Sequence, residues 1–183
     1  MPGRSFKNWR CDKTFFCNIE RRMELGPDMW NFQPDESCAE RLGERNKHMC
    51  VFMSEDGVYE EFKYPMMLIF FLYDSWQLQQ DGIYHPSVEE FSDREVRYAI
   101  GRKDEMVETI EKLKSQGLTG AFGMNCHSHV SIELYESRQK DIRINGANMN
   151  DAVAQWFKGE EPAIYIDEGC DGIACSSNCT PDY

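Results

Sequence analysis

Two residues, Asp74 and His129, have the side chains and the placement of an acid and a base that act together on a hydroxyl group. Asp74 directly follows the apolar run at residues 65–73, and His129 follows a second, glycine-rich run. A histidine takes a proton from a hydroxyl efficiently only when a third group fixes its tautomer and stabilises the imidazolium that forms. An acid and then a histidine, each just beyond a strand, are the last two members of one known order of the Ser-His-Asp triad. The sequence therefore predicts Asp74 as the acid and His129 as the base of such a triad.

Both residues also have ordinary structural explanations. An aspartate after a strand is commonly a helix cap or a turn residue, and a single histidine is commonly hydrogen-bonded without taking part in chemistry. The usual elbow for a nucleophilic serine, Gly-x-Ser-x-Gly, does not occur in the sequence. Ser128 is adjacent to His129, and that spacing cannot reproduce the elbow. The pattern thus contains an acid and a base without their nucleophile.

Two apolar runs in the sequence indicate the strands that would position Asp74 and His129. Residues 65–73 form an unbroken apolar run, which predicts a strand covered on both faces in a parallel sheet. A buried helix is the competing interpretation of such a run. Pro65 suits the start of a strand, where a missing N–H is tolerated. Residues 118–125 predict a second, short strand, with residues 126–129 in a loop.

A helix is predicted between the two strands. Ser92 and Glu95 form a capping box, and apolar residues follow at a spacing of about 3.6. Gly101 weakens the middle of this helix by about 1 kcal/mol relative to alanine, which the helix should tolerate. Gly117 stands where a left-handed residue would end the helix.

Two further helices are predicted, one before the first strand and one after the second. Residues 37–47 should form a short helix that starts with Ser37 as a capping residue. Asn148 should cap a second helix that ends at Gly159, with Trp156 and Phe157 on its apolar stripe. The residues after Gly159 read as a loop stapled by cysteines.

Length and charge limit the classes of function. A chain of 183 residues fits one ordinary domain. Its net charge of −12 disfavours nucleic acid and anionic lipid surfaces as partners, and also strongly demethylated, polyanionic polysaccharide. No apolar run approaches the roughly 18 residues that cross a bilayer, so no membrane span is predicted.

The cysteine content indicates an oxidising compartment. Eight cysteines in 183 residues fit a set of disulfides and therefore a secreted protein. The first ten residues, however, have no apolar core of a signal peptide. Either the disulfides are absent, or the true N-terminus of the protein lies upstream of Met1.

Several short motifs, taken together and in order, resemble the pectin acetylesterase and Notum family. They span residues 37 to 179, while residues 1–36 match poorly. The motifs are Ser37-Cys38-x-x-Arg41-Leu42, Cys50-Val51-Phe52, Asp74-Ser75-Trp76-Gln77, Asn125-Cys126-His127-Ser128-His129, Asn145-Gly146 followed by residues 152–157, and the cysteines Cys170, Cys175 and Cys179.

The resemblance implies a secreted serine carboxylesterase that removes O-acyl groups, such as acetate from pectin. Asp74 would correspond to the triad acid and His129 to the triad base, with no metal and no organic cofactor. The implied fold is α/β, with residues 37–183 as the C-terminal part of an α/β-hydrolase-like sheet and the N-terminal half missing. The nucleophile would then lie upstream, and this chain alone would be inactive. A disulfide between Cys50 and Cys126 is also implied, with the other pairs left open.

Other interpretations are a binding protein and a metal site. A non-catalytic, secreted, disulfide-rich binding protein could keep the same scaffold. The C-terminal cysteines with His127 and His129 could form a zinc site, but their spacings are wider than those of structural zinc sites. Trp76 and Trp156 could stack on sugar rings, although core packing is the simpler expectation for both.

Overall fold

The structure, a computed structural model, groups the chain into two compact units. One unit comprises Met1–Lys63 with Gln80–Ile83, and the other comprises Tyr64–Gln79 with Tyr84–Tyr183. Residues 1–32 and the predicted helix stop at Gly117 lie outside the part that the structure describes. The described residues are 33–51, 64–115, 119–129, 142–160, 163–168, 172–175 and 179.

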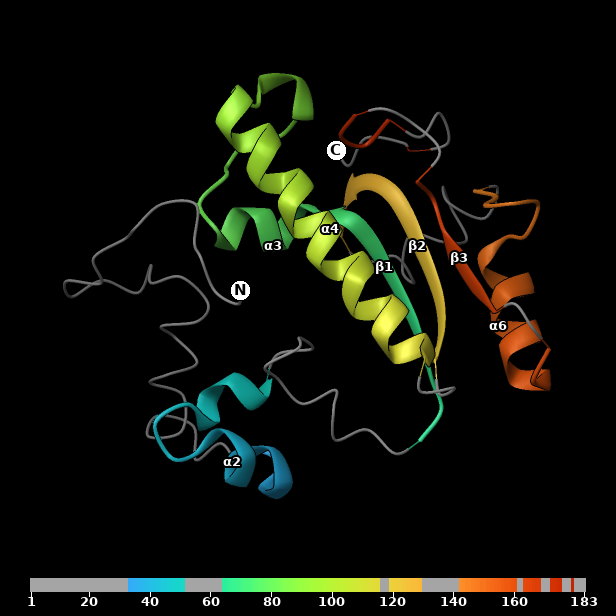
Figure 1. The fold of residues 1–183 in the computed structure, drawn as a ribbon. Helices are drawn as coiled ribbons and strands as arrows, with labels where there is room; N and C mark the ends of the chain where they lie inside the picture. Colours follow the sequence, from blue (N-terminus) through green and yellow to red (C-terminus); the bar gives the residue numbers. More distant parts are fainter. Residues whose placement is uncertain are drawn as a thin grey trace. The chain divides into compact units, whose positions relative to one another are not determined.

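The second unit is built on a three-stranded parallel sheet with the order β1-β2-β3 (Figure 1). β1 spans Met66–Asp74, β2 spans Thr119–Ser128 and β3 spans Ile164–Ile166. Helix α4, Asp93–Ser115, lies between β1 and β2 in the chain, and α6, Met149–Lys158, lies between β2 and β3. Parallel strands that alternate with helices define the α/β class, so the predicted fold class is confirmed, and the sheet is consistent with an α/β-hydrolase-like fold.

β1 forms where the apolar run predicted a strand. Pro65 precedes its first residue, so the missing N–H removes no bond from the ladder. Residues 71–73 are buried, whereas residues 66–70 are only partly buried. The described part of the chain therefore encloses the end of β1 that carries Asp74 more completely than it encloses the beginning.

Two glycines of β2 allow aromatic rings to lie directly against the strand. A Cβ atom on Gly120 would stand 2.6 Å from Cδ1 of Trp156 in α6, and one on Gly123 would stand 2.7 Å from Cζ of Phe70 in β1. Both distances are shorter than real Cβ contacts, so each glycine is required by close packing. The partly buried Trp156 thus packs onto β2, as its place on the helix stripe indicated.

β2 is longer than the sequence predicted. It continues through Cys126, His127 and Ser128, which were expected to lie in a loop. The pairs Tyr73 with His127 and Asp74 with Ser128 extend the ladder to the end of β1. The hydrogen-bonding partner of this segment is another strand, and local composition contains no signal for such a partner.

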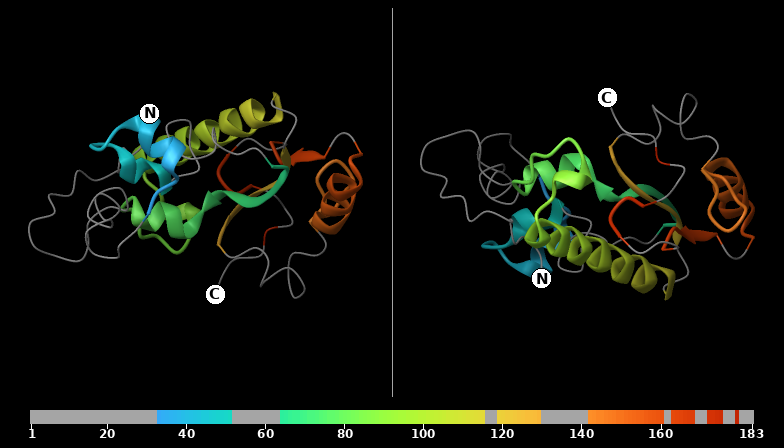
Figure 2. Two further views of the ribbon diagram at one scale, coloured as in Figure 1. Left: turned by 90° about the horizontal axis from the view of Figure 1, so that it is seen from below. Right: turned by 90° about the horizontal axis from the view of Figure 1, so that it is seen from above.

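The two long helices begin where their capping residues predicted. The Ser92 N–H donates to Oε2 of Glu95 at 2.9 Å, and the Glu95 N–H donates to Oγ of Ser92 at 3.4 Å. Asn148 and Asp151 form the same reciprocal pair at α6, which ends at Gly159 with a φ of 71°. α4 lies along β1 and β2, and α6 lies beside β3 (Figure 1 and Figure 2).

One hydrophobic core joins α6 to all three strands. Tyr165 of β3 also donates its hydroxyl to Oε1 of Gln155 in α6. β3 was predicted to be loop, because three residues are too few to show a pattern. Phe157, predicted to share the apolar stripe of α6, is 84% exposed, so that prediction was wrong. The buried members of the core are Phe71, Phe122, Met124, Cys126, Ile142, Ile144, Ala147, Met149, Ala152 and Tyr165.

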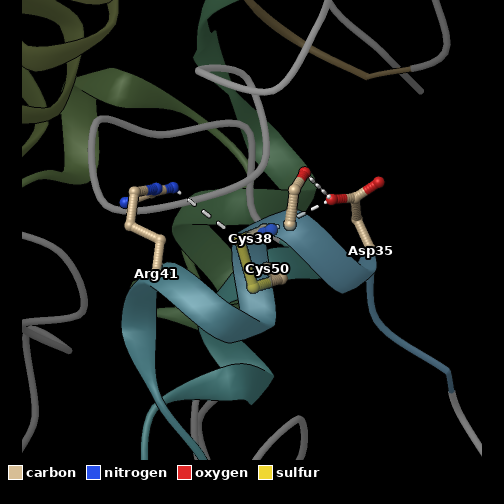
Figure 3. The surroundings of a disulfide bond; sticks show 5 residues. Asp35, Cys38, Arg41 and Cys50 are labelled. Atoms are coloured by element: carbon tan, nitrogen blue, oxygen red, sulfur yellow. Dashed lines mark hydrogen bonds between the residues drawn. A yellow bond between two sulfur atoms is a disulfide. The ribbon is translucent and has the colours of Figure 1, made fainter.

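The first unit contains a short helix, α2, at Glu36–Leu42 and a 3-10 helix at Lys47–Val51. A disulfide between Cys38 and Cys50 joins the two (Figure 3). Nη2 of Arg41 lies 3.8 Å from Sγ of Cys38 on the same helix. Among the described residues of these two helices, Cys38, Met49 and Cys50 are buried, and the covalent bond closes the region around them.

The N-cap of α2 is Asp35, two residues before the predicted one. Oδ1 of Asp35 accepts the N–H of Cys38 at 3.0 Å, and it also accepts the hydroxyl of Ser37 at 2.6 Å. A carboxylate is a strong acceptor for the free N–H groups of a helix start, so Asp35 takes the role predicted for Ser37. The predicted helix at residues 37–47 also ends early, because Gly43 follows Leu42 as its C-cap.

The disulfides correct the pairing that the family resemblance implied. Cys50 pairs with Cys38, and Cys126 pairs with Cys179, so a bond between Cys50 and Cys126 was wrong. Cys175 is also disulfide-bonded. Cys126 lies inside the hydrophobic core, where the C-terminal segment reaches it, and Cys50 bonds within its own unit. The sequence could not rank these pairs, since each depends on tertiary packing.

Candidate active site

Asp74 and His129 meet at the carboxyl edge of the parallel sheet. Asp74 is the last residue of β1, and its partner in the ladder is Ser128, the last residue of β2. His129 follows directly after Ser128. Because parallel strands end at the same edge of a sheet, the ladder brings together two residues that are distant in the sequence.

A bulge in β2 sets the register at this edge. Phe71 pairs with Met124, whereas Tyr73 pairs with His127, so β2 contains one extra residue over this interval. Side chains alternate between the faces of a strand, and one added residue therefore reverses the direction of those that follow. The bulge thus decides which way the residues just before His129 point.

The imidazole of His129 is hydrogen-bonded to the carboxylate of Asp74. Nδ1 of His129 lies 2.7 Å from Oδ2 of Asp74, which is the short distance typical of charge-assisted hydrogen bonds. A carboxylate can only accept, so Nδ1 carries the donated proton, and Nε2 is the basic nitrogen of the neutral ring. The side chains are 42% exposed for His129 and 23% exposed for Asp74, so a ligand can approach the ring.

Asp74 is a helix cap as well as the partner of His129. Its second oxygen, Oδ1, accepts the N–H of Gln77 at 2.7 Å, in the first turn of helix α3, Ser75–Gln80. The ordinary explanation of this aspartate as a helix cap is therefore confirmed, and its two oxygens have different partners, Gln77 and His129. The cap bond fixes the plane of the carboxylate and so directs Oδ2 toward the histidine.

Trp76 stacks on His129. The two ring centroids are 5.6 Å apart, and the ring planes are inclined by 22°. Trp76 is 43% exposed, so the expectation that it packs in the core was wrong. The sequence placed Trp76 two residues after Asp74 but gave no sign that its ring would stack on His129.

The other histidine of the same motif, His127, points to a different neighbour. Its ring and that of Phe91 form a T-shaped pair next to the start of α4, with centroids 5.6 Å apart and planes at 83°. Phe91 also contacts the ring of His85, whose Nε2 lies 3.3 Å from Oε1 of Glu95 and whose Nδ1 lies 3.7 Å from Oε2 of Glu90. The structure thus separates the two histidines, and it pairs only His129 with Asp74.

The carboxylate of Glu95 is stabilised in its charged form. The hydrogen bond from the Ser92 backbone N–H is the main reason that the pKa of Glu95 lies below its ordinary value. The Ser92 hydroxyl and the nearby His85 lower it further, while burial opposes them. This network fixes the start of α4 beside the sheet edge.

Two contacts attach the C-terminal segment to the strands of the site. The hydroxyl of Tyr73, next to Asp74, lies 3.4 Å from the carbonyl oxygen of Gly172. Burial raises the pKa of Tyr73, which keeps the phenol protonated as a donor. The disulfide from Cys126 to Cys179 forms the second attachment, three residues before His129. The C-terminal segment is therefore attached both to β1, through Tyr73, and to β2, through Cys126.

The described residues show no cluster of three or more metal-binding side chains. Cys175 and Cys179 are both in disulfides, which removes two sulfurs from the zinc site considered for this region. None of the described helices has the length and apolar character needed to cross a membrane.

Comparison with known proteins gives one match to a family. The family model described as Pectinacetylesterase matches residues 5–180 of the chain. No curated protein matches the chain.

Proposed function

The chain belongs to the pectinacetylesterase family, and we propose that Asp74 and His129 are the acid and the base of a serine carboxylesterase that removes O-acetyl groups from polysaccharide such as pectin. The observation that carries this proposal is the 2.7 Å contact from Nδ1 of His129 to Oδ2 of Asp74. It leaves Nε2 as the basic nitrogen, at a partly exposed position on the carboxyl edge of the sheet, where α/β proteins commonly bind their ligands.

In the proposed reaction, Nε2 of His129 takes the proton of a serine hydroxyl as its oxygen attacks the ester carbonyl. The imidazolium that results is stabilised by the carboxylate of Asp74. His129 then gives the proton to the oxygen of the departing sugar alcohol, which leaves an acyl-serine. A water molecule repeats the two proton transfers, so that acetic acid is released and serine is regenerated.

The nucleophile is the part of the triad that this sequence does not supply. No Gly-x-Ser-x-Gly pentapeptide occurs among the 183 residues. We therefore expect the serine and its oxyanion hole to come from sequence other than this chain, and the chain alone to be inactive.

The proposed substrate is an acylated polysaccharide of low negative charge. With a net charge of −12, the chain repels strongly demethylated, polyanionic pectin at long range. Acetylated and well methylated polysaccharide avoids that penalty. The disulfides at Cys38–Cys50 and Cys126–Cys179 support a secreted protein, because such bonds persist in oxidising compartments.

The test is the activity of protein expressed from its complete gene. Asp74→Asn and His129→Ala should each lower kcat by about 10⁴-fold or more, as triad losses do elsewhere. His127→Ala is the matched control, because it removes a histidine of the same motif whose ring packs against Phe91. The readouts are acetate released from acetylated pectin and 4-nitrophenol released from 4-nitrophenyl acetate.

Two results would contradict the proposal. Full turnover in both the Asp74→Asn and the His129→Ala protein would remove these residues from the mechanism and favour the binding protein with the same scaffold. Turnover by the isolated 183-residue chain, abolished by a serine-directed phosphonate, would show that the nucleophile lies within it.

A further inference from the structure

Trp76 lies directly beside the pair formed by Asp74 and His129. It stacks on the imidazole of His129 with centroids 5.6 Å apart, and yet 43% of its surface is exposed. Exposed aromatic side chains occur elsewhere in this chain, for example Phe157 at 84%, so the exposure alone assigns no role. The stack on the histidine that contacts Asp74 is the observation from which a role can be argued.

The hydrogen bond to Asp74 cannot orient His129 completely. It sets one distance, 2.7 Å from Nδ1 to Oδ2 of Asp74, and one distance leaves a combination of the two side-chain torsions of His129 free, so the ring can still turn. Such a turn swings the lone pair of Nε2 away from a reacting hydroxyl. A flat ring stacked at 22° restricts this motion, because it fixes the plane of the imidazole.

The carboxylate and the indole belong to the same turn of the chain, at the start of α3. Asp74 and Trp76 are two residues apart, and Oδ1 of Asp74 accepts the N–H of Gln77 at 2.7 Å. The cap of α3 therefore holds both contacts of the histidine in a fixed mutual position. The start of α3 thus supplies both the acceptor for Nδ1 of His129 and the indole that stacks on the imidazole.

The stack also matters when the ring becomes charged. In the proposed reaction His129 holds an extra proton while the acyl group is transferred, and it is then a cation. The face of an indole attracts a cation, and tryptophan does so best among the aromatic side chains. Trp76 thus favours the protonated intermediate state in the same geometry that positions the neutral base.

We propose that Trp76 is a positioning residue for His129: its indole ring fixes the imidazole plane and stabilises the imidazolium. The inference rests on the proposed function, because the direction of Nε2 matters only if the histidine transfers protons. Its physical content, however, is a property of the chain itself and can be measured without turnover.

The experiment is nuclear magnetic resonance of the full chain with labelled histidine. A stacked indole displaces the signals of the His129 ring protons through its ring current, and a fixed Nδ1–H exchanges slowly with water. Trp76→Ala should abolish the displacement and speed the exchange by about three- to tenfold, the range expected for loss of one aromatic pair. Trp76→Phe keeps an aromatic face and should restore most of the slow exchange.

Phe157→Ala is the matched control, since it removes another exposed aromatic side chain from a different helix, α6. It should leave both His129 signals unchanged. The inference is overturned if Trp76→Ala also leaves them unchanged in a folded chain, or if Trp76→Phe behaves like Trp76→Ala. Because neither signal depends on ester hydrolysis, this result and the failure of the esterase proposal are separate outcomes.

Kinetics of protein from the complete gene provide a second measurement. A positioning role predicts that Trp76→Ala lowers kcat to a similar degree for 4-nitrophenyl acetate and for a sugar acetate, with KM little changed. A rise in KM for the sugar acetate alone would show that the indole binds the sugar and does not position the histidine, which would overturn the inference.

Discussion

Asp74 and Ser128 are the last register partners of the β1–β2 ladder, and this pairing decides where His129 lies. The histidine follows Ser128 directly, so its ring meets the carboxylate at the point where both strands end. The same carboxylate caps α3 through its other oxygen. Two different substitutions of Asp74 can therefore separate the structural contact from the chemical one.

Both Asp74→Asn and Asp74→Ala lose the charge-assisted contact with His129, so the cap bond is isolated by the difference between the two variants. We predict that Asp74→Ala is less stable than Asp74→Asn by about 1 kcal/mol, because asparagine is as good an N-cap as aspartate and alanine offers no acceptor to the Gln77 N–H. Both variants should lose activity in protein from the complete gene. Urea denaturation followed by circular dichroism checks the stabilities, and equal destabilisation of the two variants would show that the cap bond is not what Asp74 contributes.

A glycine in the middle of α4 provides a test of helix stability. Gly101 is exposed, and an added Cβ would meet no atom within 4 Å. Gly101→Ala should therefore raise the free energy of unfolding by about 0.5–1 kcal/mol. The control is Gly120→Ala, whose Cβ would press on Trp156 and Met67, and which should instead cost about 1–3 kcal/mol. A midpoint of denaturation that rises in both variants would contradict the packing described for β2.

Local signals in the sequence predicted the helices well. The capping pairs Ser92 with Glu95 and Asn148 with Asp151 lie within four residues of chain, so no distant partner is needed to recognise them. Gly159 likewise ends α6 through its own backbone conformation. The predicted cap at Ser37 failed only because a stronger acceptor, Asp35, stands two residues upstream.

What the sequence could not show are contacts between distant segments. The order of Asp74 and His129 predicted a pair, but the extension of β2 and its bulge depend on the backbone of β1. The exposure of Trp76 and the pairing of Cys126 with Cys179 likewise depend on how separate elements meet. β3 has three residues, too few for any periodicity to indicate it.

The start of α4 should make stability depend on acid pH. The pKa of Glu95 is lowered in the folded chain, chiefly by the Ser92 N–H and further by His85, so folding favours the ionised carboxyl. This stabilisation is fully present above the ordinary value of 4.5 and is lost as the pH falls through the lower folded-state value. Glu95→Gln should thus be less stable than the natural chain at pH 7, with a difference that shrinks below pH 4.5. Thermal unfolding at several pH values measures this, and a difference that stays constant across the acid range would contradict it.

The disulfides Cys126–Cys179 and Cys38–Cys50 should contribute unequally to stability. Cys126–Cys179 closes a loop with a sequence separation of 53, and Cys38–Cys50 closes one of 12. By chain entropy, the first should contribute about 4 kcal/mol and the second about 3 kcal/mol. The first bond also lies in the core beside β2, so the double variant Cys126→Ser with Cys179→Ser buries a hydroxyl and loses more. Each double serine variant would be unfolded in urea beside the natural chain. A larger loss from the Cys38 and Cys50 pair would show that the first unit, and not the attachment of the C-terminal segment to the sheet, limits the stability of this protein.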